Sequence, residues 1–307
     1  MTIRRILVIR LGALGDFIQS FPAFSAVRRH HPEAEITLLT TAPFVSLARL
    51  SPWFDRVLTD DRPRWSDLRG LLDLRRRLRG YDRIYDLQTS SRSSRYFFLA
   101  GQKNWSGIAP GCLLPHASPV RDLMHTRARQ RDQLRMAGIA EVPEADLSWL
   151  AGEAEHEAGL PPRAVLIPGA APHRPEKRWP ADRFGELAVW LAGRGMQPVI
   201  AGTAADTPLA KRIRTLCPQA RDLTGRTSLP DLAALLSGAS LAVGNDTGPM
   251  HLAAAMGCPS LVLFSAGSDP ALTAPLGRAP GQVEVLRVAD LTTLPVERVA
   301  GTLSRRH

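Results

Sequence analysis

The sequence is poor in the residues on which disulfide-rich, zinc-binding and nucleic-acid-binding proteins depend. Its three cysteines, Cys112, Cys217 and Cys258, are widely spaced and form no CxxC pair or cysteine–histidine cluster. Neither a disulfide framework nor a zinc site is therefore expected, and a reducing cytoplasm suits the chain. Aromatic residues make up only 6% of the sequence, so stacking platforms for bases are not indicated and no nucleic-acid partner is expected.

Long apolar runs are also absent. The apolar residues 6–9, which follow Arg4 and Arg5, resemble the start of a signal peptide, but Arg10 and Asp16 interrupt the run and no small-residue cleavage site follows. A membrane-spanning helix needs about 18 or more consecutive apolar residues, and no such run occurs. We expect a cytoplasmic protein, for which peripheral contact with the inner face of the cytoplasmic membrane stays open.

Two common cofactor motifs are missing. No G-x-G-x-x-G follows a strand, so a dinucleotide fingerprint is not supported. No Asp-x-Asp pair occurs, so a divalent cation holding a diphosphate is not indicated. The sequence predicts neither a cofactor nor a metal.

The length and patterning predict two domains. At 307 residues the chain suits two domains of roughly 150 residues each. Apolar strands alternate with helices from residue 3, and the same order restarts at residues 164–168, which predicts an α/β protein with two Rossmann-like domains built on parallel sheets. We place the domains at residues 1–155 and 156–307. The elements expected are strands at 3–9, 35–40, 82–87, 164–168, 197–201, 220–223, 241–244 and 260–264, and helices at 17–29, 180–195, 207–216, 230–237, from 247, and at 291–303, the last without a predicted packing partner.

Positive charge is concentrated in the first half. The net charge is +10, and residues 1–150 carry 23 Lys and Arg against 15 Asp and Glu, whereas residues 151–307 carry 16 against 14. The basic residues gather in two runs of helical character, 62–79 and 121–135. They form either solvated helix faces or a surface that attracts an anionic acceptor or anionic lipid.

The first motif with possible chemistry is the glycine turn at residues 10–16, where Gly12 and Gly15 precede Asp16. Glycines allow a ligand to approach the backbone closely. Asp16 would stand at the carboxyl end of a parallel sheet, where open α/β folds bind ligands, and could act as a general base. The alternative is that Asp16 only caps the following helix.

Two further motifs lie in the second half. An apolar strand runs into Asn245, Asp246, Thr247 and Gly248 and then into a helix that contains His251, which is either a phosphate-binding helix start or a simple cap. The loop at residues 168–180 carries the cations Arg174, Lys177 and Arg178, which could neutralise a diphosphate or form an exposed basic loop. His251 alone is more typical of a packing histidine than of a catalytic one.

Together these stretches resemble glycosyltransferase family 9, the heptosyltransferases of the lipopolysaccharide inner core. The resemblance is carried, in the family's order and over nearly the whole chain, by residues 6–16 with Pro22, by residues 85–88, by residues 177–180, and by residues 245–248 with His251.

The resemblance implies a GT-B fold whose first domain binds the acceptor and whose second binds the donor, with parallel sheets facing a central cleft. It implies an inverting, metal-independent transfer of heptose from ADP-heptose to an anionic saccharide or lipid-linked acceptor, with Asp16 as the base and Lys177 stabilising the leaving diphosphate. The remaining implied contacts are Thr227, Asp246, Thr247, Gly248 and His251 toward the donor, and Gly12, Gly15 and Gln88 toward the acceptor.

The sequence departs from the family pattern at two places, and other functions stay open. Ala171, Pro172 and His173 stand where relatives often carry small hydroxyl residues, and Ala204 or Asp206 stands where they carry an acid for the ribose. Either departure could mean a different nucleotide sugar. The alternatives are a GT-B-type nucleotide-sugar epimerase and a non-catalytic nucleotide- or glycan-binding protein of the same fold, and a redox Rossmann enzyme comes last.

Overall fold

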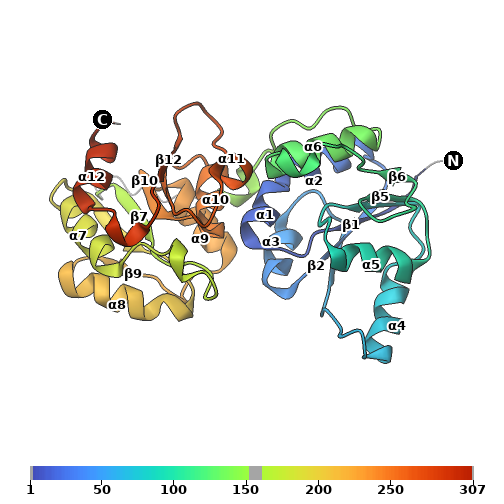
Figure 1. The fold of residues 1–307 in the computed structure, drawn as a ribbon, viewed down its shortest axis with the longest axis horizontal. Helices are drawn as coiled ribbons and strands as arrows, with labels where there is room; N and C mark the ends of the chain where they lie inside the picture. The colour runs from blue at the N-terminus through green and yellow to red at the C-terminus, as the bar shows by residue number, and fades with distance from the viewer. Residues whose placement is uncertain (1–2, 152–160, 306–307) are drawn as a thin grey trace. The chain divides into compact units, whose positions relative to one another are not determined.

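The computed structural model describes residues 3–151 and 161–305. Contacts divide the chain into two compact units, Met1–Asp146 and Leu147–His307. The division expected between residues 155 and 156 falls in the segment 152–160, outside the described residues. Each unit is an α/β domain with one six-stranded parallel sheet, as the alternating pattern predicted (Figure 1).

The sheet of the first unit has the strand order β3-β2-β1-β4-β5-β6. Its central strand pairs with β2 through Leu7 and Thr37 and with β4 through Ile9 and Asp86. Four of the five residues of β1 are fully buried, because helices cover both faces of the sheet. The strands are β1 Arg5–Ile9, β2 Glu35–Thr40, β3 Arg56–Thr59, β4 Arg83–Asp86, β5 Trp105–Gly107 and β6 Leu114–Pro115.

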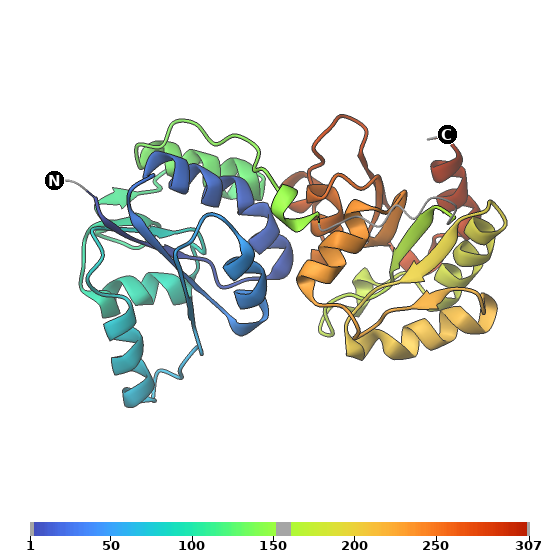
Figure 2. The same cartoon turned by 180° about the vertical axis from the view of Figure 1, so that it is seen from behind.

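Helices pack on the two faces of this sheet in separate groups. Helices α4 and α5 share a core with the central strands, in which Leu74 and Phe97 meet Leu7 and Ile84. Helices α2 and α6 lie side by side on the other face (Figures 1 and 2). The helices are α1 Leu14–Gln19, α2 Phe21–His30, α3 Val45–Leu50, α4 Leu68–Arg77, α5 Ser91–Ala100 and α6 Thr126–Met136, with 3-10 turns η1 Ala42–Phe44 and η2 Arg121–Leu123.

The second unit repeats this plan with the strand order β12-β11-β10-β7-β8-β9. Its main core joins one face of the central strands to α7, α8 and α12. Helix α10 lies on the other face, where Met250 packs against Gly244. The elements are η3 Ser148–Leu150, β7 Arg163–Ile167, η4 Pro175–Lys177, α7 Ala181–Ala192, β8 Gln197–Ile200, η5 Ala204–Asp206, α8 Thr207–Leu216, β9 Arg221–Asp222, α9 Leu229–Ser237, β10 Leu241–Asn245, α10 Gly248–Ala255, β11 Ser260–Phe264, α11 Pro270–Thr273, β12 Val283–Arg287, η6 Leu291–Thr293 and α12 Val296–Ser304.

The structure places the terminal segment and corrects one predicted helix. Helix α12 packs on α7, and the indole Nε1 of Trp179 donates a hydrogen bond of 2.9 Å to the carbonyl of Leu294. The single helix expected at residues 17–29 is two helices, α1 and α2, with Ser20 between them. Ser20 Oγ donates back to the carbonyl of Asp16 at 2.7 Å, a local side-chain bond that competes with the regular helix pattern.

Strands β3, β5, β6 and β12 and helices α3, α5 and α11 were not expected from the sequence. Strands β5 and β6 have three and two residues, too few for alternation to be recognised. In the ranges 3–151 and 161–305, no helix is long and apolar enough to cross a membrane.

Candidate functional site

The turn after β1 and the turn after β4 meet at the carboxyl edge of the first sheet. Ile9 and Asp86 are paired at the ends of these strands, so the residues that follow them are neighbours. The amide of Leu11 donates a hydrogen bond of 2.8 Å to Gln88 Oε1. The structure thereby brings Gln88 next to Gly12, although the two residues are far apart in the sequence.

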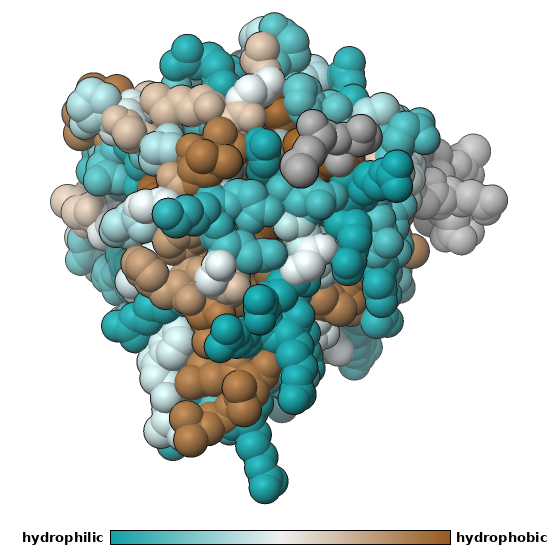
Figure 3. Space-filling view, turned by 90° about the vertical axis from the view of Figure 1, so that its right-hand side faces the viewer, coloured by the Kyte–Doolittle hydropathy of each residue, from teal (hydrophilic) through white to brown (hydrophobic). Residues whose placement is uncertain are grey.

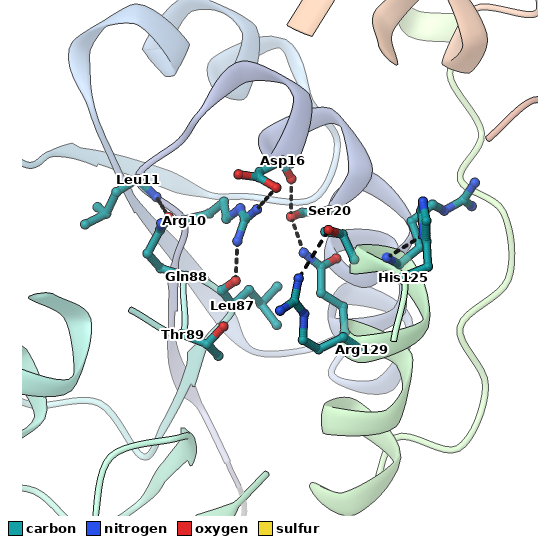
Figure 4. Close-up of polar contacts among 12 residues, drawn as sticks. Arg10, Leu11, Asp16, Ser20, Leu87, Gln88, Thr89, His125 and Arg129 are labelled. Carbon is teal, nitrogen blue, oxygen red and sulfur yellow. Dashed lines mark hydrogen bonds and ion pairs between the residues drawn. The ribbon is translucent and has the colours of Figure 1, made fainter. Parts of the chain in front are cut away.

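Asp16 lies in the first turn of α1 with its carboxylate held by Arg10. Arg10 Nη2 is 3.3 Å from Asp16 Oδ1, and the side chain of Asp16 is 43% exposed while that of Arg10 is 5% exposed. Arg10 Nη1 donates to the carbonyl of Leu87, which fixes the other side of the guanidinium (Figure 4). The carboxylate is therefore oriented from inside the domain and open toward the outside.

Arg10 carries its charge in a buried position. Burial lowers the pKa of Arg10, and the nearby carboxylates of Asp16 and Asp86 act in the opposite direction. An arginine is difficult to deprotonate even when buried, so Arg10 supplies a fixed positive charge behind Asp16. Arg10 is part of the motif at residues 10–16, but no pattern in the sequence indicates that its side chain turns inward.

A pocket of about 770 Å³ opens beside Asp16 and Gln88. This volume lies in the range of small-molecule sites. Gly12 forms part of the wall, whereas Gly15 lies in the first turn of α1 and does not line the pocket. The lining residues are Leu11, Gly12, Ala13, Asp16, Thr41, Ala42, Pro43, Phe44, Thr59, Asp60, Asp61, Arg62 and Gln88.

The backbone conformation at residue 12 and the nearby ring of Phe44 both require a glycine. It has a φ of +119°, and a Cβ atom at this position would lie 2.8 Å from the ring of Phe44. Only glycine adopts such a conformation without strain, and a side chain would also displace the wall of the pocket.

Two arginines near this turn were not among the candidate site residues expected from the sequence. Arg62 lines the pocket, and its Nη2 donates a hydrogen bond of 3.0 Å to the carbonyl of Leu11. Arg129 on α6 is half-buried, and burial lowers its pKa, together with the charge of Arg121, while Asp16 opposes the shift. Figure 4 shows Arg129 on the helix that faces Asp16 and Ser20. The basic runs were visible in the sequence, but which arginine faces the turn depends on how α6 packs.

Asp86 is fully buried beneath the same turn. Its Oδ1 accepts hydrogen bonds from the amides of Gln88 and Thr89, at 3.1 and 3.0 Å. Burial raises the pKa of Asp86 to about 6, against the lowering effects of those amides and of Arg10. Asp86 shapes the turn that carries Gln88, and its charge state affects the environment of Arg10.

In the second unit, Asn245 joins the loop at residues 168–180 to the end of β10. Asn245 is fully buried, and its Nδ2 donates to the carbonyl of Pro168 at 2.8 Å. Its Oδ1 accepts from the amide of Trp179 at 3.0 Å. One side chain thus holds both ends of the loop against the strand that leads into α10.

Lys177 and Asp246 meet as a result. Lys177 Nζ lies 2.6 Å from Asp246 Oδ2, and their side chains are 18% and 8% exposed. This ion pair neutralises the carboxylate that would otherwise repel a phosphate near the start of α10. The other two cations of the loop hold local structure, since Arg174 pairs with Glu176 and Arg178 donates to the carbonyl of Ala170.

The start of α10 presents backbone amides near this pair. Thr247 is the N-cap residue and has extended backbone, but its side chain makes no cap hydrogen bond, and Gly248 is the first helical residue. Such a helix start favours an anionic group. His251, one turn into the helix, is only 7% exposed and belongs to the buried part of α10.

The remaining predicted donor residues occupy two neighbouring turns. Thr227 is half-buried and lies directly before Ser228, the N-cap of α9. Asp206 accepts hydrogen bonds from the amide and the hydroxyl of Thr203, both at 2.8 Å, and packs against Gly169. His173 is exposed.

The described part of the chain contains no cluster of side chains typical of a metal site and no disulfide bond. Residues 3–151 and 161–305 hold no group of three or more His, Cys, Asp or Glu side chains that could bind a metal ion. The three cysteines are free and buried.

Comparison with known proteins gives concordant matches. Residues 71–293 match the family model of glycosyltransferase family 9 (heptosyltransferase). Lipopolysaccharide heptosyltransferase 2 of Escherichia coli K12 is 28% identical over 89% of this chain and 85% of its own length. Among solved structures, a family 9 glycosyl transferase from Veillonella parvula superposes with a TM-score of 0.80 at 22% identity, covering 99% of this chain and 98% of its own. E. coli heptosyltransferase WaaC with ADP gives 0.79 at 21% identity, covering 99% and 100%. These superpositions confirm the predicted GT-B fold class, with two Rossmann-like domains.

Proposed function

The chain belongs to glycosyltransferase family 9 and is a glycosyltransferase, and from this premise we propose that it transfers heptose from ADP-heptose to a saccharide of the lipopolysaccharide core. The observation that carries the proposal is Asp16, a carboxylate that borders a pocket and is held from behind by the buried Arg10. We place the reaction in the cytoplasm, with an anionic, lipid-linked acceptor bound by the first unit and the donor bound by the second.

In this proposal Asp16 is the general base. Its carboxylate takes the proton from the acceptor hydroxyl while that oxygen attacks the anomeric carbon of the donor. The bond between the anomeric carbon and the diphosphate oxygen breaks on the opposite side, and its electron pair leaves with ADP. A single displacement of this kind inverts the configuration at the anomeric carbon.

The second unit would stabilise the leaving diphosphate. The ammonium of Lys177 lies at the amino end of α10, and the amides of that helix add their partial positive charge. We assign Asp246, Thr247, Gly248 and His251 to this end of the donor, and Thr227 to its nucleoside. Gly12, Gly15 and Gln88 belong to the acceptor side.

The choice of donor follows the family. The solved structure of E. coli heptosyltransferase WaaC contains ADP, and lipopolysaccharide heptosyltransferases are among the relatives of this chain. Calorimetric titration with ADP, UDP, GDP and NAD in the presence of a chelator tests the donor directly. Selective ADP binding, weakened by Lys177→Ala, is expected. A preference for UDP or GDP would reassign the donor, and binding of NAD alone would contradict the function.

The base assignment is tested by Asp16→Asn. We expect kcat/KM for transfer to fall by about 10²–10⁴-fold, the usual contribution of general-base catalysis, with unchanged ADP affinity and thermal unfolding. Asp61→Asn is the matched control, because Asp61 lines the same pocket but pairs with Arg77. Full activity of Asp16→Asn would refute the assignment. Donor that changes without acceptor would indicate the epimerase alternative, and ADP binding without any turnover would indicate a binding protein.

A further inference from the structure

Helix α4 exposes apolar side chains on the face that points away from its own domain. Leu71, Leu74 and Leu78 are spaced for the inner face, where Leu74 and Leu78 are buried in the core. Leu68 and Leu72, one turn apart on another face, are 73% and 54% exposed. Leu68 and Leu72 are therefore exposed to solvent and do not pack in the core of the domain.

Arginines surround these leucines without acidic partners. In the described ranges, no carboxylate lies within ion-pair distance of the guanidinium groups of the exposed Arg64, Arg69, Arg75, Arg76 and Arg79. Arg77, by contrast, turns to Asp73 and Asp61, at 2.5 and 3.6 Å. Asp61 and Asp73 thus pair with Arg77, Asp67 caps the helix at the amide of Gly70, and these carboxylates do not pair with the outer arginines.

Trp65 extends the apolar strip just before the helix. It is 38% exposed, and the guanidinium carbons of Arg92 and Arg95 lie 5.6 and 5.2 Å from its ring centre. Figure 3 shows a hydrophobic patch among hydrophilic side chains at the lower end of the first unit, where Figure 1 places α4. We call Trp65, Leu68 and Leu72, with Arg64, Arg69, Arg75, Arg76 and Arg79, the α4 surface.

We propose that the α4 surface docks the protein on an anionic lipid bilayer. Leucines and a tryptophan at the level of the headgroups, with arginines beside them, are the composition of helices that lie in the membrane interface. Charge complementarity selects anionic lipid. A second copy of the chain would bring two arginine clusters together, and nucleic acid would leave Leu68 and Leu72 without a function.

The proposal goes beyond the transfer reaction and does not depend on it. It assigns the arginines of the α4 surface to lipid. Within the basic run at residues 62–79, the pocket beside Asp16 is lined by only one arginine, Arg62. Binding to vesicles involves no sugar donor, so failure of the reaction and failure of the docking would be seen separately.

The experiment is cosedimentation of the full chain with vesicles of phosphatidylcholine alone and with vesicles in which a third of the lipid is phosphatidylglycerol. We expect binding to the anionic vesicles only, weakened by salt. Arg75→Gln/Arg76→Gln should weaken it by roughly 30-fold, since each arginine near such a surface contributes about fivefold. Arg29→Gln/Arg49→Gln removes the same charge from exposed positions elsewhere in the first unit and should change it little.

Insertion of the leucines is tested separately from charge. Leu68→Gln/Leu72→Gln keeps the net charge and helix propensity and should weaken binding by roughly tenfold or more, whereas Leu113→Gln/Leu276→Gln, also exposed, should not. Brominated lipid should quench tryptophan fluorescence in the wild type and much less in Trp65→Phe. Equal binding to both vesicle types, equal effects of test and control variants, or variant-sensitive binding to an oligonucleotide without binding to vesicles would each overturn the proposal.

Discussion

At the scale of single residues, each candidate site places an opposite charge against its reactive group. Asp16 has the buried Arg10 behind it, and Lys177 has the nearly buried Asp246 beside it. Such pairs orient a side chain without removing its charge. In the proposed reaction, orientation of the base and of the cation precedes binding of either substrate.

Replacement of Gly12 tests the turn that carries Asp16. We expect Gly12→Ala to lower the free energy of unfolding by about 2–4 kcal/mol, because strain at φ +119° adds to contact with Phe44. Urea unfolding measures the loss. The control is Gly101→Ala, whose φ is +65° but whose Cβ would meet nothing within 4 Å, with an expected loss of about 1–2 kcal/mol. Equal losses of unfolding free energy in the two variants would show that the ring of Phe44 moves aside at little cost.

The buried Asp86 predicts a dependence of stability on pH. Its pKa is raised from 3.8 to about 6, so between these values the folded state holds more protons than the unfolded state, and stability falls as pH rises. Asp86→Asn removes this effect. The stability of the variant relative to wild type should therefore increase by about 2–3 kcal/mol between about pH 4 and pH 7.

Urea unfolding across this pH range measures the difference between the two proteins. Asp122→Asn removes one negative charge from a side chain that is 86% exposed, and it controls for the change in net charge. Parallel profiles for wild type and Asp86→Asn would contradict the shifted pKa. So would a relative stability that decreases with pH.

At the scale of elements, strand β10 organises the proposed donor site through Asn245. The loop at residues 168–180 has little regular structure beyond η4, and Asn245 ties its beginning and end to the sheet. This contact places Lys177 near the start of α10. A strand end, a loop and a helix start therefore act as one unit.

We expect Asn245→Ala to cost about 2–4 kcal/mol of unfolding free energy, because the amide of Trp179 and the carbonyl of Pro168 lose a buried partner. ADP affinity should fall by about tenfold or more as Lys177 loses its position, which calorimetry measures. Asn104→Ala, which removes a bond of 2.6 Å to the carbonyl of Tyr81 in the first unit, should reduce stability without changing ADP affinity. If both variants bound ADP like wild type, the loop would be held by other contacts.

At the scale of the whole molecule, the two units have the same architecture but different charge. The first half of the sequence carries most of the net positive charge, and its candidate site offers a carboxylate. The second offers a cation and a helix start. This division suits an anionic acceptor on the first unit and a diphosphate on the second.

Hydrogen exchange with ADP tests this division of roles. Protection should be strongest at residues 169–179 and 246–252, because the diphosphate would bind their backbone and Lys177, and weak at residues 10–20. Lys177→Ala should lose the protection, whereas Asp16→Asn should keep it. Strong protection confined to residues 10–20 would place the nucleotide on the first unit.

The sequence by itself determined the α/β class, most of the buried strands and the turns that carry the candidate site residues. The apolar strands, the glycine turn before Asp16 and the turn at Asn245–Gly248 follow from short periodicities and from the backbone freedom of glycine, which act within a few residues. It also carried the family, because the motifs occur in a fixed order. It could not predict β5 and β6, whose two or three residues show no periodicity.

The tertiary structure decided which side chains act together. The bond between Leu11 and Gln88 and the pair of Lys177 and Asp246 join residues 77 and 69 positions apart, which the order of the strands in each sheet brings near one another. The inward turn of Arg10 and the outward leucines of α4 depend likewise on which face of an element the core covers. Local sequence determines which faces of an element are apolar enough to be buried. Packing against the rest of the domain determines which of these faces becomes buried.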